Sequence, residues 1–246
     1  MNALIHNAAF YWGAAIVVTL AAAAWQAGRE RLDAWTMYLV GIGALVGAWF
    51  GGDVFVWLSL ASVLGSPDAD AKGMFGALAG AACGGWAVLR LRAAPFIRYA
   101  DSAAPAVALG YVVYRVGCFL NGCCFGTVSD VPWAVTFGRG TEAFVSQVTA
   151  GLIAQDAANS LFVHPTQLYH ALLGLVAFVV LLRIKKATLG RRLALALLLY
   201  GVGRFVIQFF RGDSVPIWGP LDVNHIAALV MLAIGMLLWR LRPALA

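Results

Sequence analysis

Three arginines are the residues of this sequence best suited to chemistry, because they lie in or at the end of long apolar stretches. Arg204 and Arg211 are seven positions apart and so share one face of a helix, while Arg115 lies in a different stretch. An arginine at the centre of a membrane helix costs about 2.5–3.5 kcal/mol, and such residues face the bundle interior and mark functional sites. Because guanidinium forks match phosphate, the three predict an anion site. The alternative is a structural role, in which they pair with Asp53 or with helix carbonyl groups.

The elements that position these arginines are predicted to be membrane helices. The chain has 246 residues, of which 62% are hydrophobic and 11% charged, and its mean hydropathy is +0.84. Soluble domains carry about 25% charged residues, so a soluble protein is excluded. A spanning helix needs about 20 mostly apolar residues. Seven stretches approach this length, so the chain is predicted to be an all-α integral membrane protein with seven transmembrane helices, at about 8–27, 36–64, 73–89, 103–124, 166–182, 193–210 and 224–239.

The net charge of +6 is mainly a topology signal. Of the 17 lysines and arginines, 12 lie in alternate connections between these stretches, and the remaining connections hold most of the acidic residues. Cytoplasmic loops are enriched in Lys and Arg. The N-terminus is therefore expected outside and the C-terminus in the cytoplasm, which agrees with an odd number of spans. The excess charge does not indicate a nucleic-acid partner.

One transmembrane helical domain is expected to cover residues 1–246, with an outer-face segment at about 126–165. An apolar piece at 144–154 suits an interfacial helix. Counted from the inner helix ends, Arg115 and Arg204 lie roughly 17 Å deep at 1.5 Å per residue, beyond the midplane and towards the outside. The anion site is therefore expected near the outer face.

A second polar cluster opens the fifth predicted span at the same level and runs from His164 to Tyr169. Gln167 and Tyr169 are expected to hydrogen-bond inward or to lipid headgroups, and His164 is expected to join the arginines, although a helix cap is its simpler role. Asn121 is costly if it faces lipid, unless it is only the polar end of a packing helix. His225 opens the last span and suits either the same pocket or a cap.

Three of the four cysteines cluster at Cys118, Cys123 and Cys124. Three interpretations remain open: small packing residues, a disulfide or redox pair, and a nucleophilic thiolate favoured by a nearby cation. A Cys118–Cys123 disulfide requires the helix to end near residues 121–122, and the outer compartment permits it. No further ligand stands at a spacing typical of zinc sites, so neither a metal nor a cofactor is expected.

Four segments carry a resemblance to a known family. Residues 114–126, 128–137, 164–169 and 199–211 occur in the order seen in bacterial prolipoprotein diacylglyceryl transferases, which this chain resembles over roughly residues 10–240. The resemblance implies seven spans with the N-terminus outside. It also implies a bacterial inner-membrane enzyme, active near the outer face, that moves the diacylglyceryl group of phosphatidylglycerol to a prolipoprotein lipobox cysteine and releases glycerol phosphate.

The resemblance also assigns roles to individual residues. Arg115 matches the invariant arginine of the family signature, Asn121 its second asparagine and Gly126 its glycine, while Arg204 matches the essential arginine of the sixth span, with Tyr200 and Arg211 as its neighbours. The expected catalytic residues are Arg115, Arg204, Asn121, Cys123 and His164. The expected substrate-binding residues are Arg211, Gly126, Gln167, Tyr169, Tyr200, Gln208 and Cys118.

The chain departs from the family pattern in the polar half of the site. Cys118 stands where the family has asparagine, Cys123 where it has an acidic residue, and Gln208 and His170 where it has glutamates. The phosphate-binding half is kept. Transfer to a prolipoprotein thiol is the main prediction. The alternatives are a paralogue with another thiol or hydroxyl acceptor, a membrane thiol–disulfide oxidoreductase, and a lipid-binding relative without catalysis.

Overall fold

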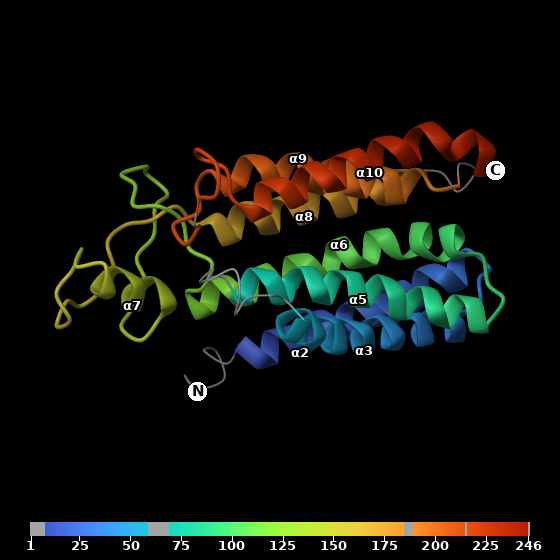
Figure 1. Cartoon of the computed structure of the whole chain (residues 1–246), viewed down its shortest axis with the longest axis horizontal. Coiled ribbons are helices and arrows are strands. Elements are labelled where there is room, and N and C mark those ends of the chain that lie inside the picture. The colour runs from blue at the N-terminus through green and yellow to red at the C-terminus, as the bar shows by residue number, and fades with distance from the viewer. Residues whose placement is uncertain (1–7, 59–68, 185–188, 215, 246) are drawn as a thin grey trace.

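The computed structural model describes residues 8–58, 69–184, 189–214 and 216–245. These residues form eight α-helices and isolated backbone bridges, with no named strand among them. The long helices run side by side, and the short α7 lies beyond one end of the bundle (Figure 1). The helices are α2 (Ala8–Arg29), α3 (Ala34–Leu58), α5 (Ala69–Leu91), α6 (Phe96–Asn121), α7 (Glu142–Thr149), α8 (Thr166–Arg183), α9 (Arg191–Gln208) and α10 (Val223–Leu245).

Within the described residues, five helices are long and apolar enough to cross a membrane, which confirms the prediction of an all-α membrane protein. Of the other two long helices, α5 has side chains described only from Gly76 and contains the apolar stretch Gly76–Leu91, and α9 carries three arginines in 18 residues. The five candidate spans are Ala9–Arg29, Ala34–Gly52, Phe96–Asn121, Thr166–Arg183 and Val223–Leu241.

The helices that carry the predicted site contact one another. α6 packs against α8 and α9, and α8 packs against α9. α2 covers another side of α6, α3 pairs with α5, and α10 pairs with α9. Residues on the facing sides of α6, α8 and α9 are therefore brought together although they are far apart in the sequence.

Glycines allow α3 and α5 to pack backbone against backbone. A Cβ atom on Gly47 would lie 2.1 Å from the carbonyl oxygen of Gly80, and one on Gly84 would lie 2.1 Å from that of Gly43. No side chain fits at these positions, and small residues are the usual means of close approach between membrane helices. This pair forms one flank of the bundle (Figure 1).

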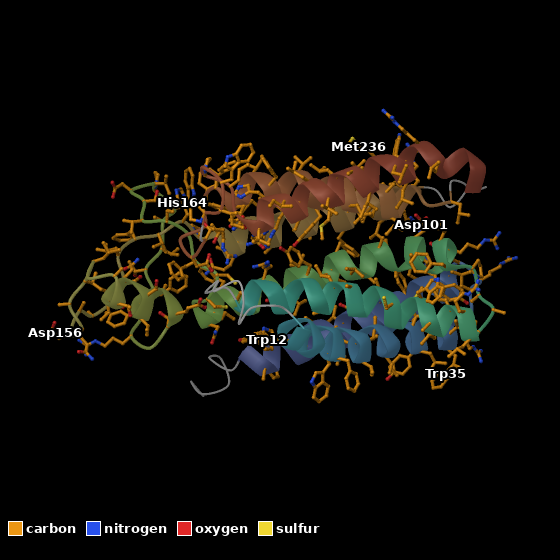
Figure 2. The ribbon with its side chains drawn as sticks, in the orientation of Figure 1. Trp12, Trp35, Asp101, Asp156, His164 and Met236 are labelled. Carbon is orange, nitrogen blue, oxygen red and sulfur yellow. The ribbon has the colours of Figure 1, made fainter. Side chains whose placement is uncertain are left out.

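The bundle has two distinct ends, the α7 end and the opposite end, where α2 is followed by α3. α2 begins at the α7 end, and α10 finishes at the opposite end (Figure 1). Trp12 and His164 lie towards the α7 end, whereas Trp35, Asp101 and Met236 lie towards the opposite end (Figure 2). Helix termini at opposite ends are what an odd number of crossings produces.

The helix expected at 144–154 is present with different bounds. α7 begins earlier, at Glu142, because the Thr141 side chain accepts a hydrogen bond from Phe144 N at 3.4 Å and caps the helix. It ends at Thr149, and the chain turns at Gly151 with a φ of +69°. The expected continuation through residue 154 is therefore wrong.

Candidate active site

Three segments that are distant in sequence cross at Gly126. Gly126 N donates to the His164 carbonyl at 3.0 Å, and Thr127 N donates to the Phe210 carbonyl at 2.8 Å. A Cβ atom on Gly126 would lie 2.5 Å from both the Cβ and the carbonyl oxygen of His164. Only glycine therefore permits this crossing, which holds the α7-end termini of α6, α8 and α9 together.

The end of α6 is set by a glycine in the left-handed conformation. Gly122 has a φ of +69° and forms the C-cap after Asn121, the last helical residue, which is half-buried. Cys123 N donates to the Cys118 carbonyl at 3.2 Å. The helix thus ends at residues 121–122, before the predicted end of the span at 124, and the chain turns back over its own last turn.

The start of α8 is anchored on the turn that follows α6. The Thr166 hydroxyl donates to the Cys124 carbonyl at 2.7 Å, and Gln167 Nε2 donates to the Cys123 carbonyl at 2.7 Å. Both side chains are fully buried. Gln167 therefore points inward, one of the two orientations that the sequence predicted, and its Oε1 atom has no hydrogen-bond partner among the described groups.

Arg115 lies in the interior of the bundle without a counter-ion. Its side chain is 5% exposed, and its guanidinium carbon lies 4.9 Å from the ring centre of Tyr111 and 5.3 Å from that of Tyr114. In the described part of the chain, its Nε and Nη1 atoms have no hydrogen-bond partner and no carboxylate pairs with it. The Asp53 side chain lies outside the described residues. Burying an unpaired charge is costly, so this guanidinium favours an anionic ligand.

Arg204 reaches the same region from α9. It is 6% exposed, and its Nη2 atom donates to Asn224 Oδ1 at 2.7 Å, a neutral partner that leaves its charge uncompensated. Tyr200 on the same helix packs edge-on against Tyr111 of α6, with ring centres 5.3 Å apart. The charges of Arg204 and Arg115 both act on this tyrosine pair, so the two guanidinium groups converge.

Arg211, unlike the other two arginines, has a described carboxylate partner that the sequence did not indicate. Its Nε and Nη2 atoms donate to the two carboxylate oxygens of Asp213 at 2.7 and 2.5 Å. Arg211 follows α9 in a turn, and a side chain two residues away reaches it there, which a continuous helix would prevent. Arg211 still lies close enough to Cys124 and Arg115 to interact with them electrostatically. It therefore borders the site as an ion pair.

His164 and Tyr169 form a polar rim at the α7 end. His164 Nδ1 lies 3.0 Å from the Tyr169 hydroxyl, which also accepts a hydrogen bond from Trp133 Nε1 at 2.7 Å. The His164 ring also packs against Phe210, with ring centres 5.1 Å apart. His164 is half-buried and contacts Phe210, the residue before Arg211.

Gln208 belongs to a buried network that the sequence only partly predicted. Its Nε2 atom donates to Asp222 Oδ2 at 2.5 Å, while Asp222 Oδ1 lies 2.8 Å from His225 Nδ1. Burial opposes ionisation of Asp222, but hydrogen bonds from the His225 backbone and from Gln208 outweigh it and hold the pKa of this carboxyl below its usual range. His225 N also donates to Asp222 Oδ1 at 3.0 Å, and Asp222 N donates to His225 Nδ1 at 3.1 Å, so the side chain that caps α10 is Asp222, with His225 as its reciprocal partner. Asp222 itself was missed, although Asp followed three residues later by a polar side chain before an apolar run is a cap signal.

His170 is a further polar residue at the site. It is fully buried. Neither of its ring nitrogens has a hydrogen-bond partner among the described residues. Its ring packs edge-on against Tyr111 at 6.0 Å. The charges of Arg115, Arg204 and Arg211 all act on it. His170 thus lies within electrostatic range of all three arginines.

The cysteine cluster is compact and reduced. The Sγ atoms of Cys118, Cys123 and Cys124 all lie within 4.8 Å of one another, and each is a free thiol. The alternative of a Cys118–Cys123 disulfide is therefore not realised in this structure. Cys83 lies apart on α5 and is exposed.

An apolar cavity of about 550 Å³ lies between α2, α3, α5 and α6. Its wall includes Tyr111 and Tyr114, the two rings that flank Arg115, and otherwise consists mostly of aliphatic side chains such as Ile16, Leu20 and Val107. Two tyrosine rings thus connect the buried Arg115 with a cavity whose apolar wall suits hydrocarbon.

Sequence comparisons agree with this combination of features. A family model described as prolipoprotein diacylglyceryl transferase matches residues 2–241. The chain belongs to the prolipoprotein diacylglyceryl transferase family. It is 26% identical to a phosphatidylglycerol–prolipoprotein diacylglyceryl transferase of Clostridium tetani, over 92% of this chain and 88% of that protein.

Other members of the prolipoprotein diacylglyceryl transferase family match a shorter region. The chain is 35% identical to a transferase of that name from Xanthomonas oryzae and 33% identical to one from Photorhabdus laumondii, over 66% of its own length. These matches cover 58% and 59% of the two relatives, less than two thirds of each. Membership of this family disfavours the thiol–disulfide oxidoreductase interpretation.

Proposed function

We propose that this protein transfers the diacylglyceryl group of phosphatidylglycerol to the lipobox cysteine of a prolipoprotein. The observation that carries the proposal is the pair of buried guanidinium groups, Arg115 and Arg204, which converge without a described carboxylate. A phosphodiester supplies the negative charge that this pair lacks. The names of the relatives specify the same donor and acceptor.

The reaction balances as a substitution at carbon. The acceptor sulfur forms a bond to the terminal glycerol carbon of the diacylglyceryl group, the bond between that carbon and the phosphate oxygen breaks, and glycerol phosphate leaves with the electron pair. Negative charge grows on the leaving phosphate, and preorganised cations aimed at developing charge are usually the largest catalytic contribution. Arg115 and Arg204 are proposed to stabilise this leaving group.

The remaining predicted residues surround this centre. The acceptor thiol must lose its proton, and His164, half-buried on the rim beside Tyr169, is proposed to take it. Asn121 and Cys123 lie at the end of α6, where the acceptor would enter. Arg211, Gly126, Gln167, Tyr200, Gln208 and Cys118 are proposed to shape the donor site, whose acyl chains fit the cavity beside Tyr111 and Tyr114.

We further propose that all seven long helices cross the bacterial inner membrane as one domain, with the N-terminus outside and the C-terminus in the cytoplasm. The lysine and arginine distribution supports this orientation, as does the position of the first and last helix ends at opposite ends of the bundle (Figure 1). The active site then lies near the outer face, where secreted prolipoproteins emerge. Reporter fusions after residues 93 and 140 should report opposite sides of the membrane.

The transferase proposal is tested by supplying labelled phosphatidylglycerol and a prolipoprotein to the purified protein. Label should move to the acceptor and glycerol phosphate should appear. Arg115→Gln should slow transfer about 100- to 1,000-fold, the usual cost of one oxyanion-stabilising donor. Arg98→Gln, on the exposed surface at the opposite end, is the matched control. Donor consumption without labelled prolipoprotein would instead indicate another acceptor, and no consumption would refute the transferase proposal.

A further inference from the structure

The three thiols clustered at the end of α6 form or break no bond in the proposed transfer. An S-diacylglyceryl cysteine is a thioether, the stable product type of the proposed reaction. A cysteine of the enzyme that accepted the group would therefore not release it to another sulfur. Cys118, Cys123 and Cys124 cannot act as a relay, and their mutual proximity requires another explanation.

The backbone is shaped to bring these thiols together. Gly122 turns the chain so that Cys123 N reaches the Cys118 carbonyl, which places Cys123 back over the last turn of α6. Cys124 has a φ of +59°, a conformation that residues with a Cβ atom rarely adopt. Tertiary hydrogen bonds hold the turn, from Thr166 to the Cys124 carbonyl and from Gln167 to the Cys123 carbonyl.

The spacing of the sulfur atoms matches a ligand set for a metal ion. At a metal–sulfur distance of about 2.3 Å, two ligands of a tetrahedral zinc ion lie roughly 3.8 Å apart. The three Sγ atoms lie within 4.8 Å of one another, so small side-chain rotations suffice to close them around one ion. Thiolate ligands select soft cations such as Cu⁺ and Zn²⁺ over Mg²⁺ and Ca²⁺.

The surroundings also suit the charge of such a complex. Three thiolates around a monovalent or divalent cation carry a net negative charge, and Arg115 and Arg211 both act electrostatically on Cys124. Gln167 is fully buried against the same turn and has an unpartnered Oε1 atom. Outer groups that orient the ligands are a regular part of metal sites, and Thr166 and Gln167 occupy this position.

We propose that Cys118, Cys123 and Cys124 bind one thiophilic d10 cation, Zn²⁺ or Cu⁺, at the outer end of α6. Each thiol loses its proton to solvent as the ion binds. The ion links the last turn of α6 to the turn on which α8 rests. Arg115 lies one helical turn earlier on α6, three residues before Cys118. The site is independent of the identity of the diacylglyceryl acceptor and of whether transfer occurs.

The test uses the full-length protein in detergent, reduced and stripped of metal. Titration with Zn²⁺ or Cu⁺ against a competing indicator should show one equivalent bound, and Mg²⁺ should not bind. Co²⁺ should produce sulfur-to-metal charge-transfer absorption. The variant C118S/C123S/C124S should lose both signals, whereas Cys83→Ser, which removes the separate thiol of α5, should retain them.

Three results would overturn the proposal: equal binding by the triple variant, absence of charge-transfer absorption with Co²⁺, or a disulfide among the three cysteines found by mass spectrometry of the alkylated native protein. Thermal unfolding of each variant checks its folding. If the triple variant does not fold, Cys124→Ser alone should weaken binding by more than about tenfold, since even outer residues of metal sites contribute 10- to 100-fold. Consumption of phosphatidylglycerol is measured separately, so failure of the transferase proposal leaves this result intact.

Discussion

At the opposite end of the bundle Arg192 of α9 pairs with Glu30, whereas nearer the α7 end Arg204 of the same helix meets only the neutral Asn224. Both arginines are about 5% exposed, and Arg115 on α6 resembles Arg204 in lacking a described carboxylate. The difference separates two uses of a buried cation. The Arg192 pair stabilises the fold, and the unpaired arginines favour an external anion at a cost to the empty protein.

The largest expected effect comes from breaking the Arg192 pair. The side chains of Arg192 and Glu30 are 6% and 12% exposed, and removing one partner of a buried pair costs about 3–5 kcal/mol. Arg192→Met should therefore lower the free energy of unfolding in detergent by about this amount. The double variant with Glu30→Gln should recover most of the loss. A change below 1 kcal/mol for Arg192→Met would mean that the pair does not stabilise the fold.

The same substitution at Arg115 should reduce activity and not stability. Arg115→Met removes a buried charge that has no described ionic partner, so folding should be unchanged or more favourable. Transfer from phosphatidylglycerol should fall about 100- to 1,000-fold, as for loss of a donor to developing charge. Parallel unfolding curves and kinetic assays check both parts. A strongly destabilised Arg115→Met variant would show that this arginine is structural.

The free energy of unfolding should depend on pH through Glu30, which lies at the end of the bundle opposite α7. Burial opposes ionisation of Glu30, but its hydrogen bond and charge interaction with Arg192 dominate and lower its pKa from the usual 4.5. A carboxyl with a lowered folded pKa stabilises the fold above its unfolded pKa and loses that contribution as the pH falls through the folded pKa. Unfolding curves should therefore show declining stability below about pH 4.5. The decline should be smaller in Glu30→Gln, and an unchanged slope would contradict the assignment.

The smallest effect is expected at Arg211, which has a counter-ion although it lies at the α7 end. Asp213 is exposed, and ion pairs with an exposed partner are worth about 0–1 kcal/mol. Asp213→Asn should alter the free energy of unfolding by less than about 1 kcal/mol. Because it releases Arg211, it should lower KM for phosphatidylglycerol while kcat stays nearly constant. An increase in KM would show that Asp213 positions Arg211 for the donor.

Much of the architecture was predictable because a membrane helix is recognised from the apolar residues of its own segment. Apolar length and the presence of arginines in apolar stretches follow from composition along a single segment. The central residues of most helices agree with the predicted stretches, whereas bounds in the outer segment do not. α7 begins at Glu142 because of the Thr141 cap, a side-chain contact that apolar patterning does not register.

The polar residues of the site were predictable from the sequence, but most of their hydrogen-bond and ion-pair partners were not. The sequence marked Arg115, Arg204, His164 and Gln167 as polar groups at one level, and the structure brings them to one end of the bundle. It did not show that Asp213 pairs with Arg211 or that Asp222 joins Gln208 to His225. These contacts depend on turns and on packing between α9 and α10, which sequence periodicity does not specify.

The sequence by itself determined the class of protein: an all-helical membrane chain with arginines in apolar helices and a family signature around them. The tertiary structure decided which charges remain unpaired and which thiols meet. The physical reason is that spanning requires only local hydrophobicity, whereas pairing depends on distances of a few ångströms between segments such as α6 and α8. The crossing at Gly126 sets those distances, and with them both the proposed phosphate site and the proposed metal site.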